Sequence, residues 1–304
     1  MTPFCALIDW GTSSFRLWLV DRQGTVLAES RSDEGMMQSS QTGFASVLEN
    51  HMGKLGAPAG LPVVISGMAG ARQGWVEAPY VDIPAPLDGL TALAVRVPHE
   101  PRDVHILPGM AQNRADAADV MRGEETQLAG IAATQPDGLV CMPGTHCKWV
   151  SLEGGHVTGM SSFMTGEIFA VVGQHSILKH ALEPQARFDA DHPTFRAAAS
   201  RALAQPAQAM AMLFPIRAGQ LLGFEGRDDG APHLSGVLIG AEIAAARELY
   251  GAGRAALVAS QRLNALYKPV MEEAGFSVDL IDGEEAVRAG LVAAARQLHP
   301  VSGE

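Results

Sequence analysis

Near its start the chain reads Asp9-Trp-Gly-Thr-Ser-Ser-Phe-Arg16, between an apolar run that ends in an acid and a second apolar run. Glycine and polar residues between apolar runs are typical of tight turns, so we predict strands over residues 4–9, 16–21 and 25–31. Glycine lets a backbone approach a ligand closely, and successive N–H groups in such a turn can form a concave anion site. The segment therefore predicts a hairpin that could bind phosphate.

A second segment has the same pattern and reads Gly144-Thr-His-Cys-Lys-Trp149. In both segments a Gly-Thr turn precedes a cation, a strand that carries a tryptophan, an acid, a glycine turn and a third strand. The second turn follows the first by almost half the length of the chain. One such turn alone indicates only a tight hairpin, whereas the repeated pattern predicts a duplicated fold with two hairpins that grip one polyphosphate.

The candidate phosphate ligands are the backbone and hydroxyl groups of these two turns. They are Gly11, Thr12, Ser13, Gly144 and Thr145. Asp9 stands directly before the first turn and is a candidate for holding Mg²⁺ through water, because this ion prefers oxygen ligands and keeps several waters. Two alternatives stay open: Asp9 could merely cap the turn, and the cations Arg16 and Lys148 could extend along their strands without reaching a ligand.

The composition excludes several classes of protein. The chain has 304 residues, of which 47% are apolar, and a formal net charge of −11. An acidic chain without a basic cluster does not favour nucleic acid or an anionic membrane as a partner, and no apolar run is long enough to span a bilayer.

Cysteine usage indicates a reducing, cytoplasmic setting. The chain has 3 cysteines and no Cys-x-x-Cys pair, which argues against a disulfide framework. A zinc cluster of Cys141, His146, Cys147 and His156 is disfavoured by the same spacing.

Strands and helices alternate along the rest of the chain, which predicts an α/β fold. Further strands are expected over residues 62–66, 139–142, 148–152, 156–160, 255–259 and 277–281. Helices are expected over residues 43–55, 113–121, 168–182, 194–222, 237–250, 262–274 and 284–298. We place a first domain at residues 1–115 and a second at residues 116–304, with helix 284–298 packing back on the first domain.

Five segments resemble a known family in their order and spacing. They are Ile8-Asp-Trp-Gly-Thr-Ser-Ser-Phe-Arg16, residues 67–80, Arg122-Gly-Glu-Glu-Thr-Gln127, Pro143-Gly-Thr-His-Cys-Lys-Trp149 and Phe163-Met-Thr-Gly-Glu167. The chain resembles the 2-dehydro-3-deoxygalactonokinase family of the actin-like, hexokinase-like ATPase superfamily. This resemblance implies an α/β fold of two ribonuclease H-like domains of the actin/hexokinase type, with an ATP cleft between them.

The resemblance also implies a reaction and its components. The implied reaction is transfer of the γ-phosphate of ATP to the 6-hydroxyl of 2-dehydro-3-deoxy-D-galactonate, a step of galactonate catabolism. ATP and Mg²⁺ are the implied cofactors and a small-molecule sugar acid is the implied partner, while a homodimer is left open. A kinase of another sugar acid or ketose, or a non-catalytic actin-like ATP-binding module, are the alternatives. Turnover of ATP that rises only with added sugar acid would favour a kinase.

A catalytic base is implied at one of two adjacent acids. Related carbohydrate kinases carry this base in a Gly-Asp-Gln segment, and Gly123-Glu-Glu125 is similar, with Glu124 in place of the aspartate. The resemblance thus implies a base at Glu124 or Glu125, and we favour Glu124. The alternative is a pair of acids at a helix start, which the helix dipole favours.

The segment of residues 67–80 is expected to line the substrate side. Arg72 could form a bidentate pair with the substrate carboxylate, and Trp75 could pack on its carbon chain. Arg16 and Lys148 are further candidates for substrate contact. A surface arginine and a core tryptophan are the alternatives for the first two residues.

Gly240 and Ser260 are the candidates for adenosine contact. Each belongs to a segment near the C-terminus where we expect a strand to lead into a helix, and such segments bear adenosine in the resembling superfamily. The double glycine that usually follows the last strand there is missing from this chain, which reads Leu257-Val-Ala-Ser-Gln261.

Overall fold

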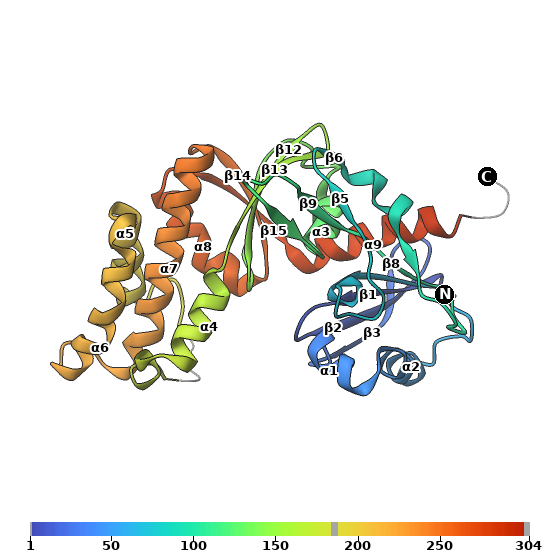
Figure 1. Cartoon of the computed structure of the whole chain (residues 1–304), viewed down its shortest axis with the longest axis horizontal. Coiled ribbons are helices and arrows are strands. Elements are labelled where there is room, and N and C mark those ends of the chain that lie inside the picture. Colours follow the sequence, from blue (N-terminus) through green and yellow to red (C-terminus); the bar gives the residue numbers. More distant parts are fainter. Residues whose placement is uncertain (1, 184–187, 301–304) are drawn as a thin grey trace. The chain divides into compact units, whose positions relative to one another are not determined.

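The computed structural model describes residues 2–183 and 188–300 of the chain. The chain forms two compact units, and each is discontinuous in sequence. The first unit contains residues 2–137, 151–160 and 283–300, and the second contains residues 138–150 and 161–282. Figure 1 labels the helices and strands of both units.

The first unit is built on a mixed six-stranded sheet with the order β3-β2-β1-β4-β8-β7. The bounds of these strands, in the same order, are Val26–Ser32, Phe15–Val20, Cys5–Trp10, Val63–Gly67, Val104–Ile106 and Val95–Arg96. Strand β1 is antiparallel to β2 and parallel to β4, and β4 is parallel to β8. The strands expected over residues 4–9, 16–21 and 25–31 are therefore confirmed as a meander at one side of this sheet.

Alternating side chains of β1 and β2 form two apolar layers. The even-numbered residues of β1 and the odd-numbered residues of β2 pack with α2 (Phe44–Lys54), for which a helix was expected. Cys5 and Leu7 of β1, with Trp18 and Val20 of β2, pack with α9 (Gly283–Leu298) on the other face. Successive side chains of a strand point to opposite faces, so this near-continuous apolar sequence reflects a sheet covered on both sides. Figure 1 shows α2 and α9 on opposite sides of β1.

The expected domain boundary at residues 115 and 116 differs from the structure. Residues 116–137 belong to the first unit, which includes α3 (Glu124–Ile131), and residues 283–300 return to it. Helices α3 and α9 lie close together, since a Cβ at Gly130 would be 1.9 Å from Ala286 O and one at Gly290 would be 1.9 Å from Thr126 O. The C-terminal helix was expected to pack on the first domain, and α9 does contact this sheet.

The helix expected over residues 113–121 is wrong. The chain instead forms β9 (Gly109–Gln112) and β10 (Asp119–Met121), which pair antiparallel in a three-stranded sheet of order β10-β9-β5 with β5 at Tyr80–Asp82. The Gln112 side-chain amide closes the turn by donating to Ala117 O at 2.6 Å. Strand pairing and this turn thus override the local helix propensity of an alanine-rich segment.

The second unit contains the successive strands β15, β14, β11, β12 and β13 of the other six-stranded sheet. Their bounds are Ser277–Asp282, Arg254–Ala259, Gly138–Met142, Cys147–Glu153 and His156–Phe163, and β12 and β13 continue past the limits of the unit. Strand β14 is parallel to both β11 and β15. The helices of this unit are α4 (Thr165–His175), α5 (Pro193–Ala204), α6 (Leu213–Leu221), α7 (Arg227–Tyr250) and α8 (Gln261–Glu273).

Helix α7 is longer than the helix expected over residues 237–250. It begins at Arg227, includes Pro232, and has two acids in its first turn. The Asp229 carboxylate accepts the Gly226 N–H at 2.8 Å, which satisfies a donor that no helical carbonyl can reach. Helices α5 and α7 run side by side in Figure 1. None of the helices among the described residues has the length and apolar character that crossing a membrane requires.

Candidate active site

The first Gly-Thr turn is held against the start of α1 (Met36–Thr42) by backbone hydrogen bonds. The Met36 N–H donates to Gly11 O at 2.9 Å, and the Met37 N–H donates to Thr12 O at 3.1 Å. Gly35 permits this close approach, because a Cβ there would lie 2.5 Å from the backbone of the turn. The carbonyl groups of the turn are therefore directed toward the helix.

The second Gly-Thr turn is held in the same way by the start of α4. The Glu167 N–H donates to Thr145 O at 2.9 Å. Gly166 is the counterpart of the glycine before α1, because a Cβ there would lie 2.3 Å from Gly144 O. The repeat seen in the sequence thus has a further counterpart in the structure: a helix start and a glycine pack on each turn.

Both turns leave backbone N–H groups available. Within the part of the chain that the structure describes, the N–H groups of Thr12 and Ser13 donate no hydrogen bond, nor do those of Thr145 and His146. All four residues are exposed. Successive N–H groups with no internal acceptor are suited to an anion such as phosphate.

Asp9 lies at the carboxyl end of β1, where it pairs in register with Ser66 of β4. Its side chain is 20% exposed and its Oδ2 lies 3.4 Å from Nη1 of Arg16. Burial raises the pKa of the Asp9 carboxyl, the Arg16 charge opposes that rise, and Glu284 at the start of α9 adds to it. The charge of Arg16 therefore offsets only part of the effects of burial and of Glu284, and the pKa of Asp9 stays raised.

The turn before α3 meets the same strand ends. The hydroxyl groups of Ser66 and Thr126 are 2.7 Å apart, and a Cβ at Gly123 would lie 3.5 Å from Cα of Gly67. Since β1 is parallel to β4, the structure brings Asp9 and the two acids at the start of α3 to one edge of the sheet. Ligand sites of α/β proteins commonly lie at this carboxyl edge.

The two acids at the start of α3 occupy different environments. The Glu125 side chain is fully buried, and both of its oxygens accept the Gly123 N–H, at 2.9 and 2.7 Å. Burial, with a smaller contribution from the neighbouring Glu124 charge, raises the pKa of Glu125 to about 8. Glu124 is half-buried, and its Oε2 accepts the Arg122 N–H at 3.0 Å. Glu124 is therefore the more accessible carboxylate, and Glu125 holds the glycine turn.

The two candidates for substrate contact in residues 67–80 differ in their packing. Arg72 is exposed, as a residue that meets a soluble ligand can be. Trp75 is partly buried in the apolar layer under the sheet, where its ring stacks on Phe44 at 5.9 Å and meets Trp10 edge-on at 6.1 Å. The position of Trp75 is thus largely explained by core packing.

Arg122 is a residue of this region that the sequence analysis did not single out. Its Nη2 donates to Ala78 O at 2.8 Å, and its guanidinium lies 4.2 Å from the ring centroid of Tyr80. Among the described residues its Nε and Nη1 atoms are buried without a hydrogen-bond partner. Arg122 connects the segment of residues 67–80 to the turn before Glu124. In the sequence, its place two residues before Glu124 was the signal that could have marked it as a residue of the site.

The second unit contains a cavity of about 400 Å³ beside the second turn. Its lining includes Gly144, Thr165, Gly166, Ser235, Ser260 and Tyr267. Gly240 does not line this cavity: it lies in α7, where a Cβ would be 2.4 Å from Ala199 O of α5. Close packing of two helices therefore explains the glycine at 240, whereas Ser260 faces the cavity as an adenosine contact would.

A buried carboxylate lies beneath this cavity, on the inner side of α7. Glu242 accepts hydrogen bonds from Trp149 Nε1 at 2.9 Å, from the Tyr267 hydroxyl at 2.8 Å and from the Thr165 hydroxyl. Burial raises the pKa of the Glu242 carboxyl despite these donors. The tyrosine hydroxyl also lies 3.1 Å from Sγ of Cys147 in β12.

The Glu242 network reaches both the cavity and the second turn. Thr165 and Tyr267 line the cavity, and Sγ of Cys147 accepts the Gly144 N–H at 3.5 Å. Sequence analysis missed this carboxylate because an acid in a helical run is usually solvated. Its placement in an apolar stretch, between Ile239 and Ile243, was the available signal.

The cations that follow the two turns are placed differently. The Arg16 side chain is 37% exposed and pairs with Asp9, whereas Lys148 is buried and its Nζ donates to the Ser162 hydroxyl. The first cation is therefore accessible from solvent beside its turn, and the second is enclosed in β12 and β13 of its own unit.

Comparisons with known proteins identify one family over nearly the whole chain. The model of the 2-keto-3-deoxy-galactonokinase family matches residues 9–294. The chain is 50% identical to the probable 2-dehydro-3-deoxygalactonokinase of Rhizobium meliloti over 98% of each chain. It is 36% identical to the 2-dehydro-3-deoxygalactonokinase of Escherichia coli, over 96% of this chain and 97% of that protein.

Solved structures of similar proteins identify the fold. A protein of the same family from Sinorhizobium meliloti is 48% identical, with a TM-score of 0.95 over 99% of each chain. Component A of (R)-2-hydroxyglutaryl-CoA dehydratase from Acidaminococcus fermentans is 12% identical, with a TM-score of 0.51 over 96% of this chain and 98% of that one. This second likeness concerns the fold alone, and the α/β fold with its two mixed six-stranded sheets is of the actin/hexokinase type.

Proposed function

The chain belongs to the 2-keto-3-deoxy-galactonokinase family, and from this premise we propose that it transfers the γ-phosphate of ATP to the 6-hydroxyl of 2-dehydro-3-deoxy-D-galactonate. The observation that carries the phosphate chemistry is the pair of turns, each with open N–H groups and a helix start packed behind it. Family membership supports the choice of sugar acid. The chain is then a phosphotransferase, and ATP is its phosphate donor.

The first unit supplies the charged groups of this mechanism. The N–H groups of Thr12 and Ser13 bind phosphate oxygens, and Arg16 can contribute its exposed guanidinium to the same anion. Asp9 fits a role in holding Mg²⁺, because it is an incompletely compensated carboxylate beside an exposed turn and this ion takes few protein ligands. When bound, Mg²⁺ would neutralise charge on the phosphate oxygens.

Glu124 orients the attacking hydroxyl and accepts its proton. A base must be accessible to the substrate, and of the two adjacent acids Glu124 is half-buried while Glu125 is enclosed. Glu125 fixes the backbone of the turn through the Gly123 N–H, so it positions the base. Arg72 is exposed in the neighbouring segment and binds the carboxylate of the sugar acid.

The second unit supplies nucleotide binding. Thr145 and His146 bind phosphate oxygens through N–H groups that have no acceptor among the described residues. The adjoining cavity of about 400 Å³, with Ser260 at its wall, receives the adenosine. Gly144 belongs to both the turn and the cavity lining, which supports continuous binding of adenosine and phosphate.

The proposal is tested with a panel of sugar acids and purified full-length protein. ATP and Mg²⁺ are supplied, and the phosphorylated product is identified by mass and by ³¹P NMR. We expect phosphorylation of 2-dehydro-3-deoxy-D-galactonate at the 6-hydroxyl, with ATP turnover that requires the sugar acid. Preferred phosphorylation of another sugar acid or ketose would replace the substrate, and turnover of ATP without any sugar would contradict the kinase assignment.

A matched pair of variants tests the substrate side of the proposal. Arg72→Ala should raise KM for the sugar acid and leave KM for ATP unchanged, because only the sugar acid carries the carboxylate that this residue binds. Arg114→Ala is the control, since Arg114 is an exposed arginine of the same unit that pairs with Asp116. Equal KM values for the sugar acid in the two variants would remove Arg72 from this role.

A further inference from the structure

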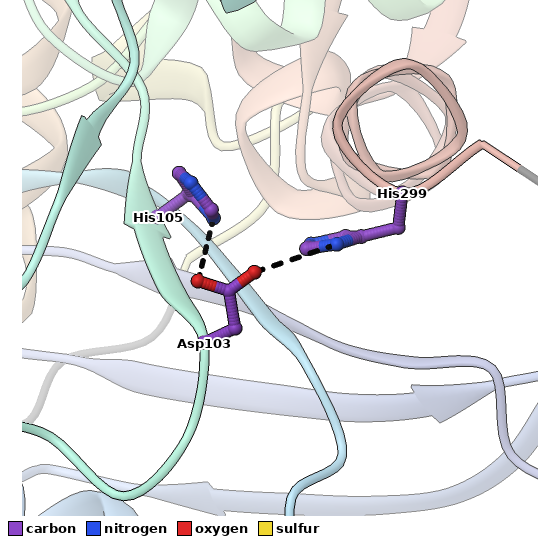
Figure 2. Close-up of side chains that lie close together, drawn as sticks. All are labelled: Asp103, His105 and His299. Atoms are coloured by element: carbon purple, nitrogen blue, oxygen red, sulfur yellow. Dashed lines mark ion pairs between the residues drawn. The ribbon is translucent and has the colours of Figure 1, made fainter.

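Two histidines and an aspartate converge in the first unit, beside strand β8. Asp103 directly precedes β8, His105 lies within β8, and His299 directly follows α9. His299 is far in sequence from Asp103 and His105, yet one ligand atom from each residue lies within 4.8 Å of the others. Figure 2 shows the Asp103 carboxylate between the two imidazole rings.

We propose that Asp103, His105 and His299 form a binding site for a transition-metal ion of the Zn²⁺ type. Two imidazole nitrogens and a carboxylate oxygen make a donor set that such ions prefer, with an open position for water. Nothing in the kinase mechanism uses these residues, so the site is separate from the phosphate-binding turns.

The distances suit ligands of one ion better than direct hydrogen bonds. Nδ1 of His105 lies 3.8 Å from Oδ1 of Asp103, and Nδ1 of His299 lies 3.7 Å from Oδ2 of the same carboxylate. Hydrogen bonds between these atoms would be about 2.7–3.2 Å long. Two ligands on a tetrahedral zinc ion, each about 2.0–2.2 Å from the metal, are about 3.4 Å apart. The two histidine–carboxylate separations are therefore within a few tenths of an ångström of this value, and the three ligand atoms, which lie within 4.8 Å of one another, would draw together around the ion.

An unpartnered nitrogen of His105 supports the assignment. Within residues 2–183 and 188–300, Nδ1 of His105 is buried and has no hydrogen-bond partner, and it is the nitrogen that faces the Asp103 carboxylate. Each histidine side chain is 16% exposed, so water reaches these rings poorly. Buried polar atoms are normally satisfied, and a bound ion would satisfy Nδ1 of His105.

The charges of the three groups also suit a cation. Burial lowers the pKa of His299, which keeps its ring neutral and able to donate a lone pair near pH 7. For Asp103, burial favours the neutral acid, but the Arg96 hydrogen bond and the nearby His105 charge outweigh it and lower the pKa. These directions leave Asp103 an anionic oxygen ligand and His299 a neutral nitrogen ligand, and metal binding requires its ligands in these forms.

Arg96 is the group that opposes metal binding. Its Nε lies 2.6 Å from Oδ1 of Asp103, and its side chain is 65% exposed. The second oxygen of the carboxylate faces His299, so the arginine and an ion can share the aspartate. The positive charge nevertheless weakens the site, and its removal should tighten binding.

A bound ion would connect two distant parts of the first unit. It would join Asp103 and His105 at β8 to His299, which directly follows α9, the helix that covers one face of the sheet. A link of this kind stabilises the folded state, because the ion binds the folded chain more tightly than the unfolded one. The expected readout is a higher melting temperature with zinc, without a requirement for zinc in turnover.

The test titrates ZnCl₂ into the chelator-treated full-length protein, in a buffer that contains Mg²⁺. We expect one equivalent to bind, and Co²⁺ to give the visible absorption of a tetrahedral site. His105→Ala and His299→Ala should each weaken zinc binding by at least about tenfold, because three protein ligands fall to two. His156→Ala, which changes an exposed histidine of the same unit, is the control and should bind like the wild type.

Two further variants keep the test decisive if a histidine variant folds poorly. Asp103→Asn should lose zinc binding while keeping a side chain of the same size, and Arg96→Ala should bind zinc more tightly than the wild type. Equal zinc affinity in the wild type, Asp103→Asn and the His105→Ala/His299→Ala double variant would overturn the proposal, and so would unchanged or weaker binding by Arg96→Ala.

Discussion

The two Gly-Thr turns have the same backbone arrangement but different supports. Behind the first turn lie Asp9 and Arg16, a partly exposed ion pair at the edge of the sheet. Behind the second lies the buried Glu242 network, which holds the strand after the turn and the cavity wall. The duplicated part is the turn with a helix start packed on it. Under the proposed function the supports differ because the first unit would provide charge for the reaction and the second would bind the nucleotide.

The largest effect that this comparison predicts follows from Glu124→Gln in the first unit. Turnover should fall by about 10²- to 10⁴-fold, the usual contribution of a positioned base, while ATP binding is retained. Steady-state kinetics with the sugar acid, together with ATP binding by calorimetry, measures both quantities. Glu153→Gln, which changes an exposed acid of the same unit, is the control. Near-normal turnover in Glu124→Gln would remove this residue from the role of base.

Adding a methyl group behind each turn should have the next largest effect. In Gly35→Ala and Gly166→Ala the new Cβ would lie 2.5 Å and 2.3 Å from turn atoms, so the turn must move. A displacement near 1 Å costs about 10²-fold in an oriented reaction, and we expect a loss of roughly this size in kcat/KM for ATP. Gly53→Ala and Gly253→Ala are the controls, because a Cβ at either position meets nothing within 4 Å.

The activities of Gly35→Ala and Gly166→Ala show whether both turns bind phosphate or only one of them does. If both turns bind phosphate, both variants lose activity and both controls keep it. Full activity in one of the two turn variants, with the fold intact by circular dichroism, would restrict phosphate binding to the other turn.

A smaller effect is expected from Asp9→Asn. The change keeps the size of the side chain but removes its charge, so the Mg²⁺ concentration for half-maximal activity should rise by roughly tenfold. The Mg²⁺ titration should be unchanged in Asp33→Asn, which alters an exposed acid near the same turn. An Asp9→Asn titration that overlays the wild type would show that Asp9 supports the turn without contributing to metal binding.

In the second unit, Glu242→Gln should affect nucleotide binding more than turnover. The amide nitrogen would face the donating hydroxyl of Tyr267, so the cavity wall loses an acceptor and unfolding should become easier by about 1–3 kcal/mol. We expect KM for ATP to rise several-fold, with kcat little changed. Glu248→Gln, an exposed acid on the same helix, is the control. A fall in kcat without a change in KM would contradict the division between the units.

The smallest effect on activity is expected at Glu125, where the prediction concerns the pH dependence of stability. The pKa of Glu125 is raised to about 8, from 4.5, so the folded chain binds this proton more tightly than the unfolded chain. Its contribution to stability is therefore present at low pH and is lost as pH rises from about 4.5 through 8. Thermal unfolding of Glu125→Gln should show a smaller fall in Tm between pH 6 and pH 9 than the wild type. Identical pH profiles would mean that Glu125 is ionised in the folded protein at neutral pH.

Local features of the fold could be predicted from the sequence where pattern and packing agree. The apolar runs on either side of Gly11 form strands, and the C-terminal helix expected over residues 284–298 is α9. The family and the actin/hexokinase type of fold were also identified from motifs, and the comparisons confirm both. The sequence pattern was sufficient here because the two strands are near-continuous apolar runs between turn residues, and α9 has apolar residues at helical spacing.

Features that depend on distant contacts could not be predicted in the same way. The first unit takes in residues 116–137 because α3 packs on α9, which is a contact across more than half of the chain. Gly240 is a sequence-based candidate for adenosine contact, but the sequence does not show that this glycine packs on α5, because the contact joins two separate helices. Glu242 and the Asp103 cluster depend on neighbours far away in sequence, and no local pattern announces them.

Hydrogen–deuterium exchange tests most directly whether both turns bind the phosphates of ATP. The amides of Thr12, Ser13, Thr145 and His146 are exposed and donate no hydrogen bond within the described chain, so they should exchange fast in the free protein. With a non-hydrolysable ATP analogue and Mg²⁺, we predict slower exchange at both turns. Slower exchange at only one turn, or at neither, would contradict the account.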